Sequence, residues 1–210
     1  PMVFTGFYPI ESTQYEPLKV ALEKLRLNDS SFSFEPEPSQ ALGFGFRCGF
    51  LGLLHLDIIR ERLVREYTMQ VVVTVPSVGY HLTKNNGETI VAHGAIAFPD
   101  PSFIRDITEP WVRMDIITPE EYVGGTMQMV QDFRGIYVQT EYLGNDSARR
   151  VILHYELPLS QILVDFYDRL KSVSQGYASM NYELLDYRPA NVRRMDILVA
   201  EIPEESLATI

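Results

Sequence analysis

The chain has 210 residues, of which 46% are hydrophobic and 22% charged, and its formal net charge is −10. This composition is typical of a globular protein with one large or two small domains, and the negative charge excludes polyanion binding by bulk attraction. Local arginine and lysine clusters can still contact phosphates. No apolar run of about eighteen residues and no signal peptide are visible, so we expect a cytosolic or organellar-matrix protein.

The first part of the chain alternates strand and helix patterns. Alternating apolar residues predict strands over residues 2–9, 31–35 and 41–47, and a β-branched run predicts another over residues 70–75. Residues 13–16 have the form of a capping box, and the apolar face that follows predicts a helix. This face is formed by Leu18, Ala21, Leu22 and Leu25.

A glycine-rich segment leads into the second predicted helix, within residues 47–67. Leu56, Ile59, Leu63 and Tyr67 recur at helical spacing, so this helix has one apolar face. The approach to it contains four glycines, which predicts a sharply bent backbone or one that comes close to a neighbour. They are Gly43, Gly45, Gly49 and Gly52. The lone Cys48 beside them is expected to be a small core residue.

Residues 78–108 interrupt this alternation. Asn85-Asn86-Gly87 lies between two short β-prone runs and predicts a hairpin turn, and prolines in residues 98–101 mark a connector. His81 and His93 are the only candidate metal ligands here. No cysteine or carboxylate stands beside them at ligand spacing, so we expect no metal site.

The strand and helix pattern then returns. Strands are predicted over residues 111–117, 136–143, 149–157 and 178–185, with an edge strand over 195–199 and a turn at 144–147. Thr118 as N-cap, Pro119 at the first helical position and Glu121 reaching back predict a helix that ends at Gly135. Its apolar face consists of Tyr122, Thr126, Met129 and Phe133. A further helix is predicted from Ser160 to Gly176.

Both halves therefore have the order β-α-β-β-α-β. This order predicts an α+β protein with two tandem ferredoxin-like domains, each with an antiparallel sheet and two helices on one face. We expect domains over residues 1–78 and 109–200, a hairpin and linker over 79–108, and the start of a C-terminal region over 201–210.

No catalytic motif is visible. None of the four lysines follows a glycine, so there is no phosphate-binding loop, and no zinc-binding spacing occurs. His55 and Asp57 resemble an acid-base pair, but residues two apart on a helix do not face each other. We therefore predict no catalytic, cofactor-binding or metal-binding residue in this chain.

Several segments resemble elongation factor G in the order in which they occur there. Residues 52–58 resemble its domain III motif Gly-Glu-Leu-His-Leu-Glu-Ile. Glu109-Pro110, residues 118–124 and Arg134-Gly135 resemble the start of its domain V, and residues 169–179 are similar to the second helix and following strand of that domain.

Only about thirty residues separate the two regions, too few for the extra domain of elongation factor G. Residues 44–55, 176–179 and 182–183 instead resemble the LepA family, also called elongation factor 4. The resemblance implies a central fragment of a ribosome-dependent GTPase that promotes back-translocation and fidelity of protein synthesis. GTP and Mg²⁺ would be bound in a domain outside this chain.

The resemblance also implies partners and residue roles. The partner would be the ribosome, through rRNA and ribosomal proteins near the GTPase-associated region; we expect no DNA binding and a monomeric fragment. Expected rRNA contacts are Arg134, Arg169, Lys171 and Arg188. Structural roles are expected for Gly49, Gly52, His55, Asp57, Thr118, Pro119, Glu121, Tyr122, Gly124, Gly135 and Gly176. The intact protein would be cytoplasmic, with peripheral association with the inner face of the cell membrane.

Two other functions are compatible with the sequence. The acidic charge and the lack of a catalytic motif also fit a stand-alone protein-interaction or regulatory module with duplicated ferredoxin-like domains. A small enzyme that uses His55 or Asp57 is the third hypothesis. Packing roles are expected for Tyr122 and Tyr177, because aromatic residues on a helical face usually lie in the core.

Overall fold

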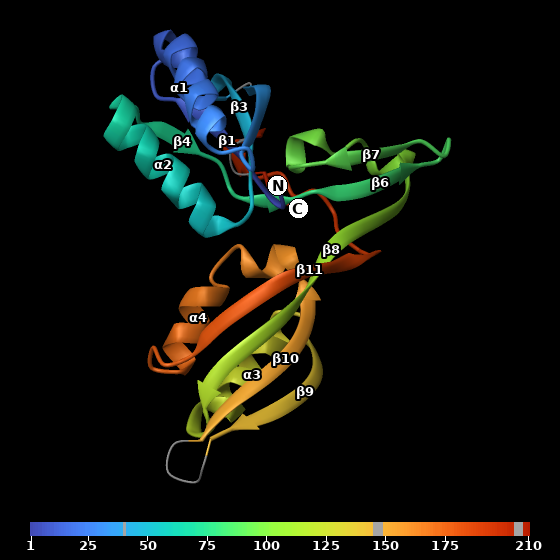
Figure 1. The fold of residues 1–210 in the computed structure, drawn as a ribbon. Coiled ribbons are helices and arrows are strands. Elements are labelled where there is room, and N and C mark those ends of the chain that lie inside the picture. Colours follow the sequence, from blue (N-terminus) through green and yellow to red (C-terminus); the bar gives the residue numbers. More distant parts are fainter. Residues whose placement is uncertain (40, 145–148, 204–207) are drawn as a thin grey trace. The chain divides into compact units, whose positions relative to one another are not determined.

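The structure is a computed structural model that describes residues 1–39, 41–144, 149–203 and 208–210 (Figure 1). It contains two compact units. The first comprises Pro1–Ile107 and Asn191–Ile210, and the second comprises Thr108–Ala190. Residues 191–200, which the sequence pattern groups with the second domain, therefore cluster with the first unit.

The first unit is built on an antiparallel sheet of strands β1 (Val3–Pro9), β2 (Ser33–Ser39), β3 (Gly43–Phe50) and β4 (Val71–Val73). The strand order is β2-β3-β1-β4, and a short strand β5 (Ser77–Val78) also pairs with β1. Helices α1 (Tyr15–Asn28) and α2 (Leu53–Tyr67) connect these strands. The order of elements and of strands is that of a ferredoxin-like domain.

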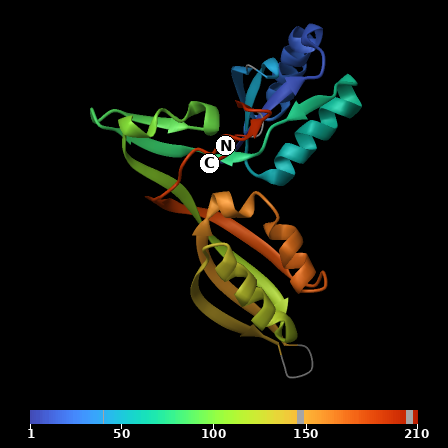
Figure 2. The same cartoon turned by 180° about the vertical axis from the view of Figure 1, so that it is seen from behind.

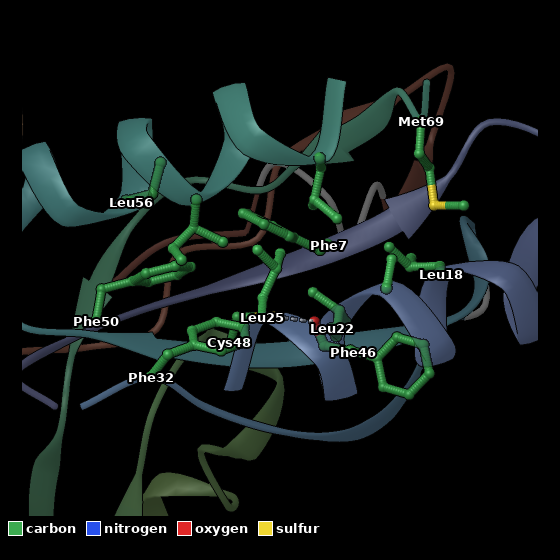
Figure 3. Close-up of a cluster of buried hydrophobic side chains, with 13 residues drawn as sticks. Phe7, Leu18, Leu22, Leu25, Phe32, Phe46, Cys48, Phe50, Leu56 and Met69 are labelled. Carbon is green, nitrogen blue, oxygen red and sulfur yellow. Dashed lines mark hydrogen bonds between the residues drawn. The ribbon is translucent and has the colours of Figure 1, made fainter. Parts of the chain in front are cut away.

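The core of the first unit lies between its sheet and the two helices (Figure 3). The predicted apolar face of α1 is fully buried there, and so is the predicted face of α2 up to Leu63. Each fully buried leucine or phenylalanine contributes about 1.5–3 kcal/mol through removal from water. The side chains from the sheet include Phe7, Phe46, Cys48 and Phe50. Cys48 is therefore the core residue that the sequence predicts.

The predicted capping box of α1 is wrong. A 3-10 turn, Ser12–Gln14, precedes the helix, and the N-cap residue Gln14 makes no side-chain capping hydrogen bond. The turn already satisfies backbone groups that a capping side chain would otherwise bond, since the Gln14 amide donates to the Glu11 carbonyl at 2.9 Å.

The predicted hairpin is confirmed. Strands β6 (Tyr80–Lys84) and β7 (Thr89–Ala92) are antiparallel, and Gly87 in the turn has φ +87°. Glycine adopts this left-handed conformation without the steric cost that a side chain adds. Two 3-10 turns, η2 (Ala95–Ala97) and η3 (Pro101–Phe103), lie on either side of residues 98–100 in the predicted connector.

The second unit repeats the same order of elements. Strands β8 (Ile104–Pro119), β9 (Ile136–Leu143), β10 (Arg150–Pro158) and β11 (Ser179–Pro189) alternate with helices α3 (Val123–Asp132) and α4 (Phe166–Val173), and β8 begins before the first residue of the unit. The strand order is β11-β8-β10-β9, and all pairings are antiparallel. Both helices lie along one side of this sheet (Figures 1 and 2). The predicted fold class, tandem ferredoxin-like α+β domains, is confirmed.

The predicted start of α3 is wrong. Thr118 and Pro119 are the last residues of β8, a 3-10 turn η4 (Glu120–Tyr122) follows, and no side chain caps α3. Thr118 is fully buried, and its hydroxyl has no hydrogen-bond partner among the described residues. Thr118 pairs with Val151 in the sheet, and this strand pairing outweighs the preference of threonine for a helix N-cap.

The predicted end of α3 needs a second correction. Arg134, not Gly135, adopts the left-handed conformation, with φ +61°. Gly135 is needed for space, because a Cβ atom there would lie 2.8 Å from the carbonyl oxygen of Val130.

The second predicted helix of this unit is interrupted. The 3-10 turn η5 (Leu159–Ile162) comes first, Asp165 has φ +59°, and only Phe166–Val173 are α-helical. Ile162, Phe166 and Leu170 are nevertheless buried as predicted.

The predicted edge strand over residues 195–199 is also wrong. Met195 forms an isolated bridge with Thr209, and β12 (Leu198–Val199) pairs with β13 (Ile202–Pro203). The predicted turn at 144–147 lies outside the described residues except for Gly144, whose φ is +92°.

Candidate functional site

Arg134 is held by a buried carboxylate. Its guanidinium donates to Glu109 at 2.6 Å, and the second oxygen of Glu109 lies 3.3 Å from the Ser160 hydroxyl. Glu109 is completely buried, so it depends on these partners for compensation of its charge. Arg134 therefore links β8, the α3–β9 connection and η5, and this role competes with phosphate binding.

Arg188 is also committed to partners within its own sheet. It donates to Glu156 at 2.6 Å and to Asp186 at 2.9 Å, and its guanidinium stacks 4.6 Å from the Trp111 ring centroid. The hydrogen bond to Glu156, followed by the bond to Asp186, raises the pKa of Arg188. A guanidinium with two carboxylates and an aromatic ring has little capacity left for an rRNA phosphate.

Lys171 closes the loop after α4. Its ammonium donates to the carbonyls of Ala178 at 2.6 Å and of Gly176 at 3.2 Å, and it lies 5.4 Å from the Tyr167 ring centroid. Gly176 has φ +85°, so it supplies the left-handed turn that brings these carbonyls back towards the helix. Lys171 stabilises this loop.

Arg169 is the most available of the four predicted contacts. It is exposed, and its guanidinium lies 5.3 Å from the Phe133 ring centroid. Within the described part of the chain it makes no ion pair. A guanidinium positioned by an aromatic ring, and with no carboxylate to neutralise it, can donate to a phosphate oxygen.

An aromatic pair lies beside the loop after α4. The rings of Tyr122 and Tyr177 are stacked, with centroids 6.0 Å apart and an interplanar angle of 11°. Desolvation raises the pKa of Tyr122, with Glu121 and Tyr177 adding to the effect. Tyr177 is 68% exposed, so the packing expected of it is with the Tyr122 ring at the surface and not in the core. The left-handed turn at Gly176 carries its ring outward onto Tyr122 instead of into the core.

His55 and Asp57 are not brought together. His55 accepts the Leu51 amide hydrogen on Nδ1 at 3.1 Å, and its Nε2 lies 2.9 Å from Asp29. Asp57 is exposed and forms an ion pair with Arg60 at 3.4 Å. His55 therefore fixes the start of α2 against the end of α1, as expected for a structural histidine.

Asp29 is the partner that gives His55 this role. Hydrogen bonds from Ser31 are the main reason that the pKa of Asp29 is lowered, and His55 adds to the effect.

Two of the glycines before α2 are needed because neighbouring atoms leave no room for a side chain. A Cβ atom at Gly45 would lie 2.6 Å from the Phe7 carbonyl oxygen, and one at Gly49 would lie 2.5 Å from the Ser33 hydroxyl. Gly52 has φ −177°, an extended conformation open to any residue.

The sequence analysis missed a polar cluster on the first sheet, away from the helices. Arg47 donates to Glu37 and to the His93 carbonyl, and Tyr8 donates to Glu37 at 2.9 Å. The Arg47 and Glu37 side chains are only 10% and 13% exposed. The cluster connects three strands to the segment after β7. The alternation of β2 and β3 could have revealed it, because Glu35 and Glu37 both point away from the apolar face.

The described residues contain no group of three or more metal-ligand side chains, and no helix among them has the length and apolarity to span a membrane. His81 and His93, for which the sequence predicts no metal site, belong to no such group among the described residues. Desolvation, followed by the Arg47 charge, lowers the pKa of His93.

Residues 106–198 match the family described as "Elongation factor G C-terminus". Proteins named elongation factor 4 from Symbiobacterium thermophilum, Lactococcus lactis and Parabacteroides distasonis are 53%, 51% and 50% identical to all 210 residues. The chain is similar to elongation factor 4 along its whole length. The resemblance inferred from the sequence is thereby confirmed.

The chain spans about a third of these elongation factor 4 proteins, between 34% and 35% of their length. A crystal structure of a protein from Thermus thermophilus has a TM-score of 0.55 over 90% of this chain and 41% of that chain. Its sequence identity is 20%, so the match supports the fold alone.

Proposed function

We propose that the chain is the ribosome-docking part of a translation factor of the elongation factor 4 type. Identity of about half over all 210 residues to proteins of that name carries this proposal. The intact protein would be a cytoplasmic, ribosome-dependent GTPase that promotes back-translocation and fidelity. Residues that bind GTP and Mg²⁺ would lie in another part of it, and peripheral membrane association stays a prediction.

The described side chains support docking better than catalysis. His55 is bonded to Asp29 and the Leu51 amide, and Asp57 pairs with Arg60 at the surface. No acid-base pair results from them. An exposed Arg169 and the stacked, exposed Tyr177 instead offer a phosphate contact and a surface for base stacking.

Sedimentation of the intact protein with purified ribosomes tests the proposal. GTP hydrolysis is measured in the same samples with and without ribosomes, and we expect both co-sedimentation and ribosome-stimulated hydrolysis. Arg169→Glu should weaken ribosome binding roughly threefold to tenfold, because it replaces an attraction to phosphate by repulsion. Arg105→Glu, at another exposed arginine, is the matched control. Absence of co-sedimentation by the unmodified protein would refute the proposal.

A further inference from the structure

Strand β9 forms one edge of the sheet in the second unit. Among the described residues it pairs with β10 alone, on one of its two sides (Figure 1). An edge strand presents unpaired backbone N–H and C=O groups on its outer side, and these groups can form hydrogen bonds with another extended chain.

The side chains of β9 do little to discourage such pairing. Seven of its eight residues are exposed, and the strand contains no lysine or proline; its protection is limited to the charge of Glu141 and a β-bulge at Val138, between Tyr137 and Gln139. Proteins commonly use charged residues and proline to protect an edge strand, and an unprotected hydrophobic edge tends to pair. The exposed apolar residues are Ile136, Tyr137, Val138, Tyr142 and Leu143, between 43% and 64% exposed. We therefore expect a partner to cover this edge in the working complex.

The sheet face beside this edge is acidic. Strand register places Asp115 next to His154 and Gln139, on the face opposite the buried residues Met114 and Tyr155. Among the described residues, carboxylates outnumber cationic side chains on this face. The carboxylates belong to Asp115, Glu141, Glu156, Glu183 and Asp186, and the cationic groups to Arg113, Arg150 and Arg188.

The carboxylates nearest to β9 are open to solvent. Asp115 and Glu141 are 45% and 51% exposed, and His154 lies between them, 2.6 Å from Asp115 and 3.3 Å from Glu141. Their field repels a nucleic-acid phosphate and attracts lysine or arginine.

We propose that β9 binds an extended, lysine- and arginine-rich segment of a protein by strand addition. Backbone hydrogen bonds to the free edge supply binding energy, alternate apolar side chains contact the exposed apolar residues of β9, and the basic groups lie over the acidic face. The inference rests on the proposed function, since it places this segment in a ribosomal protein. RNA fits this surface less well, because both Asp115 and Glu141 would repel its phosphates.

A photo-crosslinking amino acid at Val138 of the intact protein tests the proposal on purified ribosomes. We expect a cross-link to a ribosomal protein, mapped by mass spectrometry to a basic segment. The same amino acid at Leu27, an 86% exposed position in the first unit, is the control for non-specific capture. The proposal would be overturned by a cross-link to rRNA or to a second copy of the factor, or by the absence of any cross-link. It would also be overturned if Leu27 cross-linked to the same segment with equal yield.

Co-sedimentation in the same samples distinguishes a failure of the role of β9 from a failure of ribosome docking. Ribosome binding without the expected cross-link overturns only the role of β9, whereas loss of ribosome binding by the unmodified protein overturns the proposed function and this inference together. Glu141→Lys should lower the yield of the Val138 cross-link about fivefold to tenfold through charge repulsion, with thermal unfolding unchanged. Glu61→Lys, on an exposed helix face, should leave the yield unchanged. Equal yields for the two variants would also count against the proposal.

Discussion

The guanidinium of Arg134 lies 2.6 Å from the carboxylate of Glu109, and Glu109 is completely buried whereas the Arg134 side chain is 46% exposed. One partner of this ion pair is therefore in the protein interior and the other is at the surface. Removal of the exposed partner strands a charge in the interior, which costs more than the pair itself contributes to stability.

Arg134→Ala should consequently destabilise the protein by on the order of 3 kcal/mol, because Glu109 loses its main compensating charge. Urea unfolding of the chain measures this change. The double variant Glu109→Gln, Arg134→Ala should regain part of the loss, since a neutral amide costs less to bury. Arg169→Ala is the control at an exposed arginine, and an equal loss of stability there would contradict the proposed role of the pair.

Two glycines of the α3 region should respond to alanine with opposite signs. At Gly135 a Cβ atom would lie 2.8 Å from the Val130 carbonyl oxygen, whereas nothing lies within 4 Å of a Cβ atom at Gly124. Gly135→Ala should destabilise by about 1–3 kcal/mol through the steric clash. Gly124→Ala, in the helix, should stabilise by about 0.5–1 kcal/mol.

Thermal unfolding of both glycine variants and of the unmodified chain gives this comparison directly. Gly135 and Gly124 both belong to the motif shared with the translation factors, so a common motif role predicts the same sign for both. A loss of stability at Gly124 as large as that at Gly135 would show that local space is not the deciding factor.

Stability should fall in mild acid because of His93. The His93 ring lies against the tilted Phe4 ring with centroids 3.8 Å apart, and desolvation lowers the pKa of His93 below the ordinary value of 6.5. The unfolded chain therefore takes up this proton more readily, and stability is lost as the pH falls from about 6.5 towards the folded pKa. Above about pH 7 the group is neutral in both states and contributes no pH dependence.

The charged groups around His93 modify this response. Arg47, His81 and the N-terminal amine lower its pKa further, and Glu35 raises it. Urea unfolding midpoints at about pH 7.5 and pH 5.5 should differ less for His93→Gln than for the unmodified chain. An unchanged pH dependence in the variant would assign the loss to other groups.

The parts of the fold that depend on repeating apolar residues were predictable from sequence. The faces of α1 and α2, the hairpin turn at Gly87 and the order of both halves follow from periodicity and turn chemistry. The helix starts expected at Thr13 and Thr118 could not be predicted correctly from sequence, because 3-10 turns and strand pairing satisfied the backbone groups that a cap would bond.

The candidate site was less predictable than the fold. Basic residue type alone made Arg134, Arg169, Lys171 and Arg188 equivalent in the sequence. Their partners are far along the chain or are backbone carbonyls, as for Arg134 with Glu109 and Lys171 with Ala178. Only tertiary structure separates the exposed Arg169 from arginines already bonded to carboxylates.

The cluster around Arg47 should hold the segment after β7 against the first sheet. Arg47→Met keeps an apolar stem of similar length, but it removes the positive charge that pairs with Glu37, which is 13% exposed, and the donor to the His93 carbonyl. The chain should lose on the order of 3 kcal/mol of stability. Backbone amides of β7 and of residues 93–97 should also exchange with solvent faster than those of α1, because the contact between this segment and β3 is lost.

Hydrogen exchange followed by mass spectrometry resolves that local effect from global loss of stability. Arg62→Met is the matched control, since Arg62 forms a solvent-accessible ion pair with Glu66 on α2 and such pairs contribute little to stability. If Arg47→Met accelerates exchange equally in β7 and in α1, Arg47 stabilises the whole unit without a specific hold on the hairpin. If exchange in β7 matches that of Arg62→Met, the bond from Arg47 to the His93 carbonyl does not position this segment.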